Sequence, residues 1–213
     1  MIACGLDFSM TSPGLCVSDG RFYSFTSFFD CEGKKWDDSR KSLKQFEGHR
    51  RIADAVHLVP FTRQKTTGLD YVEAEKIHLD NACHLARLVM SYLPESSDTK
   101  IVLEGFSFNS RGASYLDLAV SNAFVRKALC ERYGSERIIV LPPALVKKFA
   151  TGKGNATKER MVEAFVESGD LRLAATSFHA LLREDKELRG MKPVDDLVDA
   201  YWLHRYAEAK GLL

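Results

Sequence analysis

The chain lacks a long apolar run. None of its hydrophobic stretches reaches the roughly 18 residues that a membrane-spanning helix needs. The first ten residues, MIACGLDFSM, have no basic start and turn polar at once. We therefore interpret them as a first strand and not as a signal peptide, and we expect no membrane partner.

Cysteine is scarce and shows no pairing pattern. The sequence holds five cysteines, an odd number, and no two of them have the CxxC spacing: Cys4, Cys16, Cys31, Cys83 and Cys130. This pattern argues against a disulfide scaffold and against a cysteine zinc site. It favours reduced thiols and a cytoplasmic location.

Neither sign of charge dominates, because the formal net charge is only +1. Basic residues nevertheless gather locally, at 34–51 and at 143–160. The second stretch carries Lys147, Lys148, Lys153, Lys158 and Arg160 against Glu159 alone. A basic patch on a near-neutral protein suits a polyanion bound at a defined place. The alternative for either stretch is solvated surface charge.

Length and pattern predict one α/β domain over residues 1–213. We expect strands over 2–8, 15–18, 21–29, 100–105 and 137–141, and helices over 69–93, 113–133, 144–149, 156–167 and from about Asp195 onward. Residues 30–66 predict a loop with a short helix or two, and 168–192 show no clear pattern, so both are expected insertions. The order of elements predicts a mixed five-stranded sheet, ordered 3-2-1-4-5, with helices on both faces. This is a ribonuclease H-like fold.

Four acids occupy suggestive positions in this predicted fold. Asp7 ends the first strand and Glu104 ends the fourth, and these two strands are neighbours in the predicted sheet. Asp196 and Asp199 lie three residues apart on the last helix, so both face the same side. Four carboxylates placed together repel one another and need a cation. Oxygen ligands favour Mg²⁺ or Mn²⁺ over zinc, and a pair of such ions suits phosphodiester hydrolysis.

Taken singly, several of these acids have simpler explanations. Asp7 can be explained as a turn-forming residue that caps the following loop. Glu104 would be unremarkable at an exposed strand end. Asp195 follows Pro193 and is explained as a helix N-cap, a role that Asp196 could share. Asp199 lies a full turn inside the helix, so capping does not account for it.

Four segments resemble the RuvC family of Holliday junction resolvases, particularly the divergent RuvC-like proteins of bacteriophages. They are GLDFSMTSPGL at 5–15, VLEGF at 102–106, LPPALVKKFATGKGNATKERMV at 141–162 and VDDLVDA at 194–200. The resemblance implies that Asp7, Glu104, Asp196 and Asp199 bind two divalent metal ions. It leaves Asp195 out of register, as a cap. A phage origin would place the protein in the cytoplasm of a bacterial host.

The segment GKGNATK at 152–158 lacks the order of a Walker phosphate loop. Its glycines would let the backbone approach phosphates, and backbone N–H groups opening a helix at Ala156 would add positive potential. The resemblance implies that Lys153 and Lys158 contact DNA near the cut, with Lys158 stabilising transition-state charge. Without it, the segment is a basic loop between helices.

The loop after Glu104 offers further DNA contacts. The resemblance implies that Phe106 or Phe108 stacks on bases at the branch point, where a ring face is indifferent to sequence. One of the two rings would then pack in the core. Arg111 in the same loop is a candidate phosphate contact.

These features predict a metal-dependent endodeoxyribonuclease that resolves Holliday junctions and other branched DNA. A four-way junction has two strands to cut, so we expect a homodimer, with the helix at 113–133 as the interface implied by the resemblance. Two alternatives remain: a noncatalytic DNA-binding relative, and an ATP-dependent kinase-like enzyme of the actin fold. The kinase requires a duplicated domain and a second phosphate loop, which this sequence lacks.

Overall fold

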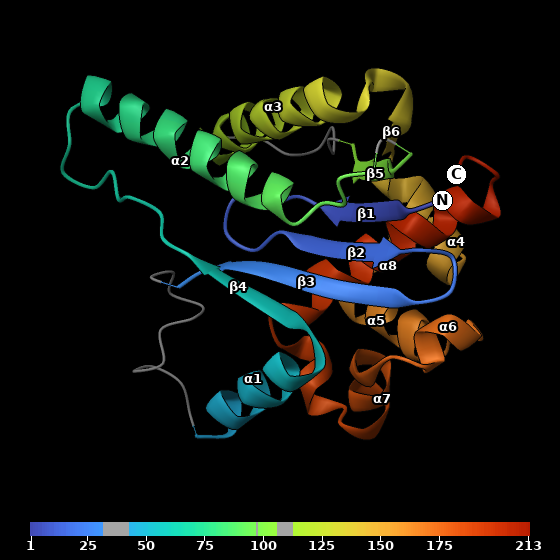
Figure 1. Ribbon diagram of the computed structural model, residues 1–213. Coiled ribbons are helices and arrows are strands. Elements are labelled where there is room, and N and C mark those ends of the chain that lie inside the picture. The colour runs from blue at the N-terminus through green and yellow to red at the C-terminus, as the bar shows by residue number, and fades with distance from the viewer. Residues whose placement is uncertain (32–42, 97, 106–112) are drawn as a thin grey trace.

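A mixed β-sheet lies at the centre of the molecule, with helices on both faces (Figure 1). The computed structural model describes residues 1–31, 43–96, 98–105 and 113–213, and of residues 43–47 and 113–116 it describes the backbone only. Within these ranges no helix has both the length and the apolar content to cross a membrane.

Among the described residues, the sheet has six strands in the order β4-β3-β2-β1-β5-β6. In chain order they are β1 (Ala3–Asp7), β2 (Gly14–Ser18), β3 (Tyr23–Asp30), β4 (His57–Phe61), β5 (Lys100–Glu104) and β6 (Ile138–Leu141). β1, β2 and β3 pair antiparallel in sequence. β5 pairs parallel to β1, β6 pairs parallel to β5, and β4 pairs parallel to β3. The order predicted for five strands is therefore confirmed.

The sixth strand, β4, corrects the prediction of five. It lies in the segment 30–66, where the sequence predicts a loop and short helices, and it follows helix α1 (Leu43–Ala55). Pro60 cannot donate a ladder hydrogen bond, which argues against a central strand but is tolerated at a sheet edge. β4 is that edge, since its partner within the sheet is β3 alone.

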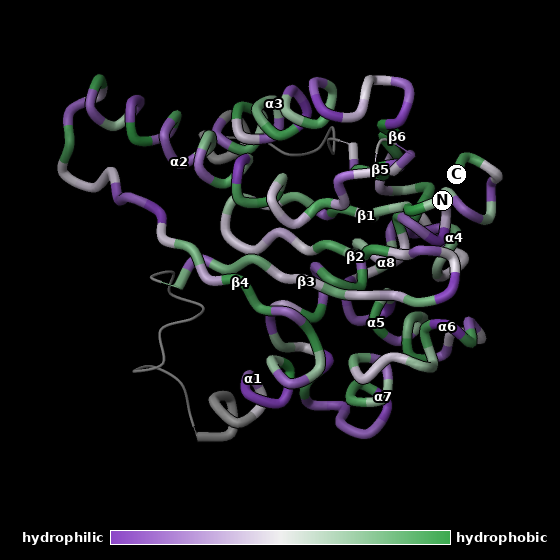
Figure 2. Tube along the Cα trace, in the orientation of Figure 1, coloured by the Kyte–Doolittle hydropathy of each residue, from purple (hydrophilic) through white to green (hydrophobic). Residues whose placement is uncertain are grey.

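Helices α2 (Tyr71–Ser91) and α3 (Ala113–Tyr133) cover one face of the sheet. Both carry hydrophobic and hydrophilic residues along their length (Figure 2). The other face is covered by α4 (Pro143–Thr151), α5 (Lys158–Val166) and α8 (Val194–Ala209). A short 3-10 helix, η2 (Ser135–Arg137), leads into β6. Each face has its own hydrophobic core.

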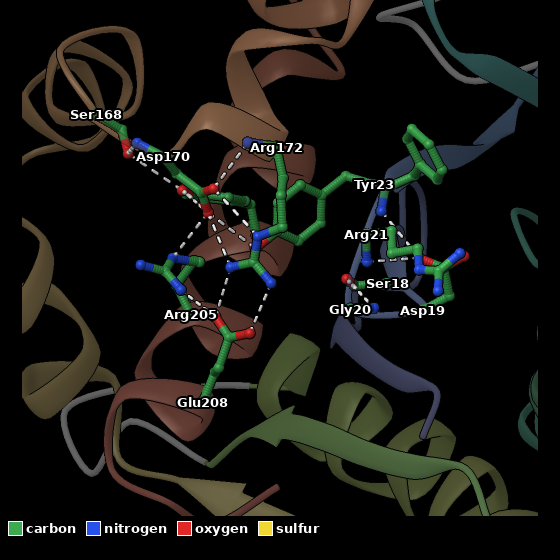
Figure 3. A network of polar contacts seen from close by, with 12 residues as sticks. Ser18, Asp19, Gly20, Arg21, Tyr23, Ser168, Asp170, Arg172, Arg205 and Glu208 are labelled. Carbon is green, nitrogen blue, oxygen red and sulfur yellow. Dashed lines mark hydrogen bonds and ion pairs between the residues drawn. The ribbon is translucent and has the colours of Figure 1, made fainter.

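The segment 168–192 folds into short helices: α6 (Leu171–Ala174), α7 (Ser177–Glu184) and η3 (Glu187–Gly190). A polar network, the Asp170 network, fixes it to the far end of α8 (Figure 3). Asp170 accepts from the Tyr23 hydroxyl at 3.0 Å and pairs with Arg172 and Arg205. Arg172 also reaches Glu208 at 2.7 Å. Arg205 and Glu208 of α8 are therefore paired with this segment.

Two glycines let α8 lie directly on the sheet. A Cβ atom on Gly5 would stand 1.9 Å from the Ala200 carbonyl oxygen, and one on Gly14 would stand 2.4 Å from that of Asp196. Such distances are impossible, so any larger residue would push the helix away. The glycines of β1 and β2 thus set the distance between α8 and the sheet, and with it the position of the acids on α8.

Candidate active site

The four predicted acids come from three elements that meet at one edge of the sheet. Asp7 is the last residue of β1 and Glu104 the last of β5. These strands are parallel neighbours with Leu6 opposite Leu103, so their final residues lie side by side. The first turns of α8 pack across β1 and β2 and bring Asp196 and Asp199 to the same place.

The charges of these acids act on one another. Burial raises the pKa of Asp7 well above its usual value, and the charges of Asp199, Asp196 and Glu104 raise it further. The pKa of Asp199 rises to about 7, first through burial and then through Glu104. Burial likewise raises the pKa values of Glu104 and Asp196. The structure therefore brings the four carboxylates into one electrostatic unit.

Asp196 is the most firmly held of the four and is almost fully buried. The Ser12 hydroxyl donates to its Oδ2 at 2.7 Å, and Lys192 Nζ donates to its Oδ1 at 2.5 Å. Neither Ser12 nor Lys192 was predicted from the sequence. The spacing of Lys192, four residues before Asp196, is a signal for an ion pair in a helical turn, whereas Ser12 offered none.

The predicted capping role of Asp195 is wrong. The N-cap residue of α8 is Pro193, and no side chain caps that end. Asp195 instead pairs with Lys158 and, at 2.9 Å, with Lys192. Burial alone would raise its pKa, but the hydrogen bonds from the two lysines lower it. Asp195 is thus held by two lysines and not by the backbone of the helix end.

The predicted lysines divide into two pairs. Lys158 and Lys147 act on the acids, since the charges of both lower the pKa of Glu104 against the effect of burial. The pKa of Lys158 is itself raised, because the Asp195 hydrogen bond and the nearby acids outweigh its partial burial. Lys148 and Lys153 are exposed on α4 and on the loop after it.

The loop at 152–157 has structural reasons for its glycines. Gly152 ends α4 with φ at 80°, a conformation that favours glycine. A Cβ atom on Gly154 would lie 3.1 Å from the Ala144 carbonyl oxygen. Helix α5 begins at Lys158 with Thr157 as its cap, two residues after the predicted start. The N–H groups at that helix end therefore lie beside Lys158.

The other predicted DNA contacts, Phe106, Phe108 and Arg111, lie outside the described residues. The strand end before them is well anchored. Gly105 donates its N–H to the Leu141 carbonyl at 2.8 Å, and Arg126 donates to the Glu104 carbonyl at 3.2 Å.

The donor chemistry of the site fits a hard divalent cation, because all four predicted ligands are carboxylates. Within the described ranges, Asp7, Glu104 and Asp199 have no hydrogen-bond or ion-pair partner for their side chains. Yet no three His, Cys, Asp or Glu side chains in that part of the chain are arranged so that they could hold a metal ion as they stand. Asp196 contributes to this, since both of its oxygens are already engaged.

The mixed sheet with helices on both faces has the strand order predicted from the sequence, with β4 added at one edge. Two solved structures are similar to this chain: RuvC of Thermus thermophilus, and T. thermophilus RuvC in complex with a Holliday junction substrate. Each is 13% identical to the chain and covers 99% of it, with 97% and 96% of the RuvC chains matched and TM-scores of 0.45 and 0.48. No family model and no curated protein matches.

Proposed function

We propose that this protein is a divalent-metal-dependent endodeoxyribonuclease that resolves Holliday junctions, and other branched DNA, by phosphodiester hydrolysis. One observation carries the proposal. Burial and three carboxylates from β5 and α8 raise the pKa of Asp7 at the end of β1, and two lysines stand beside these four acids. Carboxylates that repel one another in this way need a cation to neutralise them. Lysines beside that cation would bind a phosphate group.

Asp7, Glu104, Asp196 and Asp199 would hold Mg²⁺ or Mn²⁺, two ions per site by our prediction. Such ions activate a water molecule and stabilise charge on the leaving oxygen. The chain's own part is to fix the ligands. Ser12 orients Asp196, and the strand register sets Asp7 beside Glu104.

The lysines would position the DNA. Lys147 and Lys158 lie close enough to Glu104 to act on its pKa, so both can reach a phosphate bound at the acids. Lys158 would also stabilise charge that develops on that phosphate. Lys148 and Lys153 are exposed beside them and would contact the neighbouring backbone. Phe106 or Phe108 would stack on bases, and Arg111 would bind a phosphate.

We also propose that the protein acts as a homodimer joined through α3. A four-way junction has two strands to cut, and a two-fold dimer presents two sites to them. Sedimentation equilibrium measures the mass directly. A single 23.9 kDa species at all concentrations, alone and with junction DNA, would contradict the dimer.

The decisive experiment is cleavage of a labelled panel of branched DNAs with Mg²⁺ or Mn²⁺, and with EDTA as the control. We expect cleavage of the four-way junction that EDTA abolishes. Asp7→Asn should bind the junction normally but cleave it about 10²–10³-fold more slowly, in line with the loss of one group that stabilises transition-state charge. Undiminished cleavage by this variant would sink the metal site.

The same panel separates the alternatives. A wild-type protein that binds the junction but never cuts it would be the noncatalytic relative. ATP turnover in the absence of DNA would identify the kinase-like enzyme.

A further inference from the structure

Lys192 stands inside the acidic site, although it belongs to the segment before α8. Its Nζ lies 2.5 Å from Asp196 Oδ1 and 2.9 Å from Asp195 Oδ2. The side chain is only 20% exposed, so its charge is placed among the acids and not in solvent. One ammonium group thus bridges two adjacent carboxylates.

The bridge takes up the coordination capacity of Asp196. Ser12 donates to Oδ2, and the Lys192 ammonium group stands 2.5 Å from Oδ1, so a divalent cation that approaches Oδ1 meets a like charge in direct contact with that oxygen. A buried carboxylate without a partner would be costly, which gives this arrangement a structural purpose. It also means that a divalent cation binds Asp196 Oδ1 at a cost in charge repulsion unless the Lys192 ammonium group moves aside.

Lys158 differs from Lys192 in this respect. It pairs with Asp195 and not with Asp196, and its side chain is 60% exposed. It can therefore turn toward a phosphate without uncovering a buried ligand. Lys192 is the cation that competes directly for a predicted metal ligand.

We propose that Lys192 is a built-in counter-ion that occupies Asp196 and that a divalent cation must displace. This rests on the proposed function, because it takes Asp196 as a metal ligand. Asp195 Oδ2 already accepts from the same ammonium group, so Asp195 retains Lys192 when Asp196 turns to the metal. Lys192 thus weakens metal binding and keeps Asp196 neutralised before the metal arrives.

The test is Mn²⁺ binding by titration calorimetry, without DNA, to the full chain. Lys192→Met keeps the stem and removes the charge, and should bind Mn²⁺ about tenfold more tightly, as expected when a partly buried like charge leaves a cation site. Lys192→Arg should resemble the wild type. Lys186→Met is the matched control: it removes a positive charge from the same segment, where Lys186 is exposed, and should change nothing.

A double-mutant cycle tests the role of Asp195. Asp195→Asn should weaken Mn²⁺ binding in the wild type, because Lys192 then has only Asp196 as a partner. In the Lys192→Met background the same change should have a smaller effect. Equal effects in both backgrounds would overturn the idea that Asp195 retains Lys192.

The outcomes separate this inference from the proposed function. If Asp199→Asn abolishes Mn²⁺ binding but Lys192→Met binds as the wild type does, or more weakly, the metal site stands and the counter-ion is wrong. If Asp199→Asn leaves Mn²⁺ binding unchanged, or the wild type binds none, both proposals fail. A thermal melt checks folding, and Mn²⁺ should raise the Tm of Lys192→Met more than that of the wild type.

Discussion

Asp199 and His204 lie on the same helix, and burial moves their pKa values in opposite directions. It disfavours whichever form is charged, so it raises the pKa of the acid to about 7 and lowers that of the imidazole to about 4. Nearby Glu104 adds to the first shift. The two groups therefore titrate over the same pH range with opposite effects on stability.

For Asp199, the folded protein holds a proton that the unfolded chain has released above its usual pKa of 3.8. Without metal, its contribution to the free energy of unfolding must fall as pH rises from about 4 to 7. We expect Asp199→Asn in EDTA to remove that part of the slope, measured by urea unfolding across this range. An unchanged slope would mean that Asp199 titrates normally.

His204 is 2% exposed, and its Nδ1 has no hydrogen-bond partner. The unfolded chain binds a proton there below about 6.5, while the folded protein resists it down to about 4. Stability must therefore fall as pH drops through this range, by up to about 3 kcal/mol. His204→Phe should lose this acid sensitivity, as followed by chemical unfolding between pH 4 and 7. A variant as acid-sensitive as the wild type would refute this.

At the scale of elements, the contact of α8 with β1 and β2 decides the geometry of the site. A Cβ atom on Gly14 would meet the Asp196 carbonyl carbon at 2.6 Å as well as its oxygen, so the helix backbone itself must move. The three atoms nearest to that Cβ position all belong to the backbone of α8, so no flexible side chain among them can move aside.

We expect Gly14→Ala to destabilise the protein by about 1–3 kcal/mol or more, as overpacking does. It should also reduce metal affinity and cleavage, because Asp196 moves with the helix. Gly169→Ala is the control, since nothing lies within 4 Å of a Cβ atom there. Urea unfolding and Mn²⁺ titration of both variants provide the measurement. Normal metal affinity in Gly14→Ala would show that the contact does not set the site.

Elements with strong apolar runs could be predicted from the sequence, and others could not. Strands β1, β5 and β6 and the long helices lie within a few residues of their predicted ranges. β4 was missed because HLVPF contains a proline, which only a sheet edge tolerates. The short helices of 168–192 span only four to eight residues, and helices this short depend on tertiary packing, here of α7 on α1 and α5 and of η3 on α8, so local pattern alone did not show them.

At the scale of the whole molecule, the sequence could predict that the four acids meet. The strand ends and the spacing on the helix are local features, and the predicted strand order brings them together. Of their lysine partners, Lys158 was expected near the acids from the family resemblance, whereas Lys192 was not predicted. Lys192 lies four residues before Asp196 but outside α8, which begins at Val194, so the periodicity of the helix did not place it at the site. The Asp170 network likewise joins β3, α6 and α8, three parts of the chain that no sequence pattern connects (Figure 3).

We expect Arg172→Met to destabilise the fold by about 2 kcal/mol, because it removes charged hydrogen bonds to Asp170 and Glu208 and leaves both acids with Arg205 as their remaining shared partner. The control is Arg160→Met, which breaks an exposed pair with Glu163 and should cost about 0.5 kcal/mol or less. Urea unfolding compares the two. Equal losses would show that the network contributes no more than a surface pair.

The glycine contact also has a consequence for the order of events during synthesis. Asp7 and Glu104 leave the ribosome well before Asp196 and Asp199, which reach them only when α8 settles on Gly5 and Gly14. A nascent chain in which α8 is still inside the exit tunnel therefore exposes Asp7 and Glu104 only. These two acids are not yet covered by the helix. The complete acidic cluster forms only after α8 has packed on the sheet, and its appearance would report that this packing step has taken place.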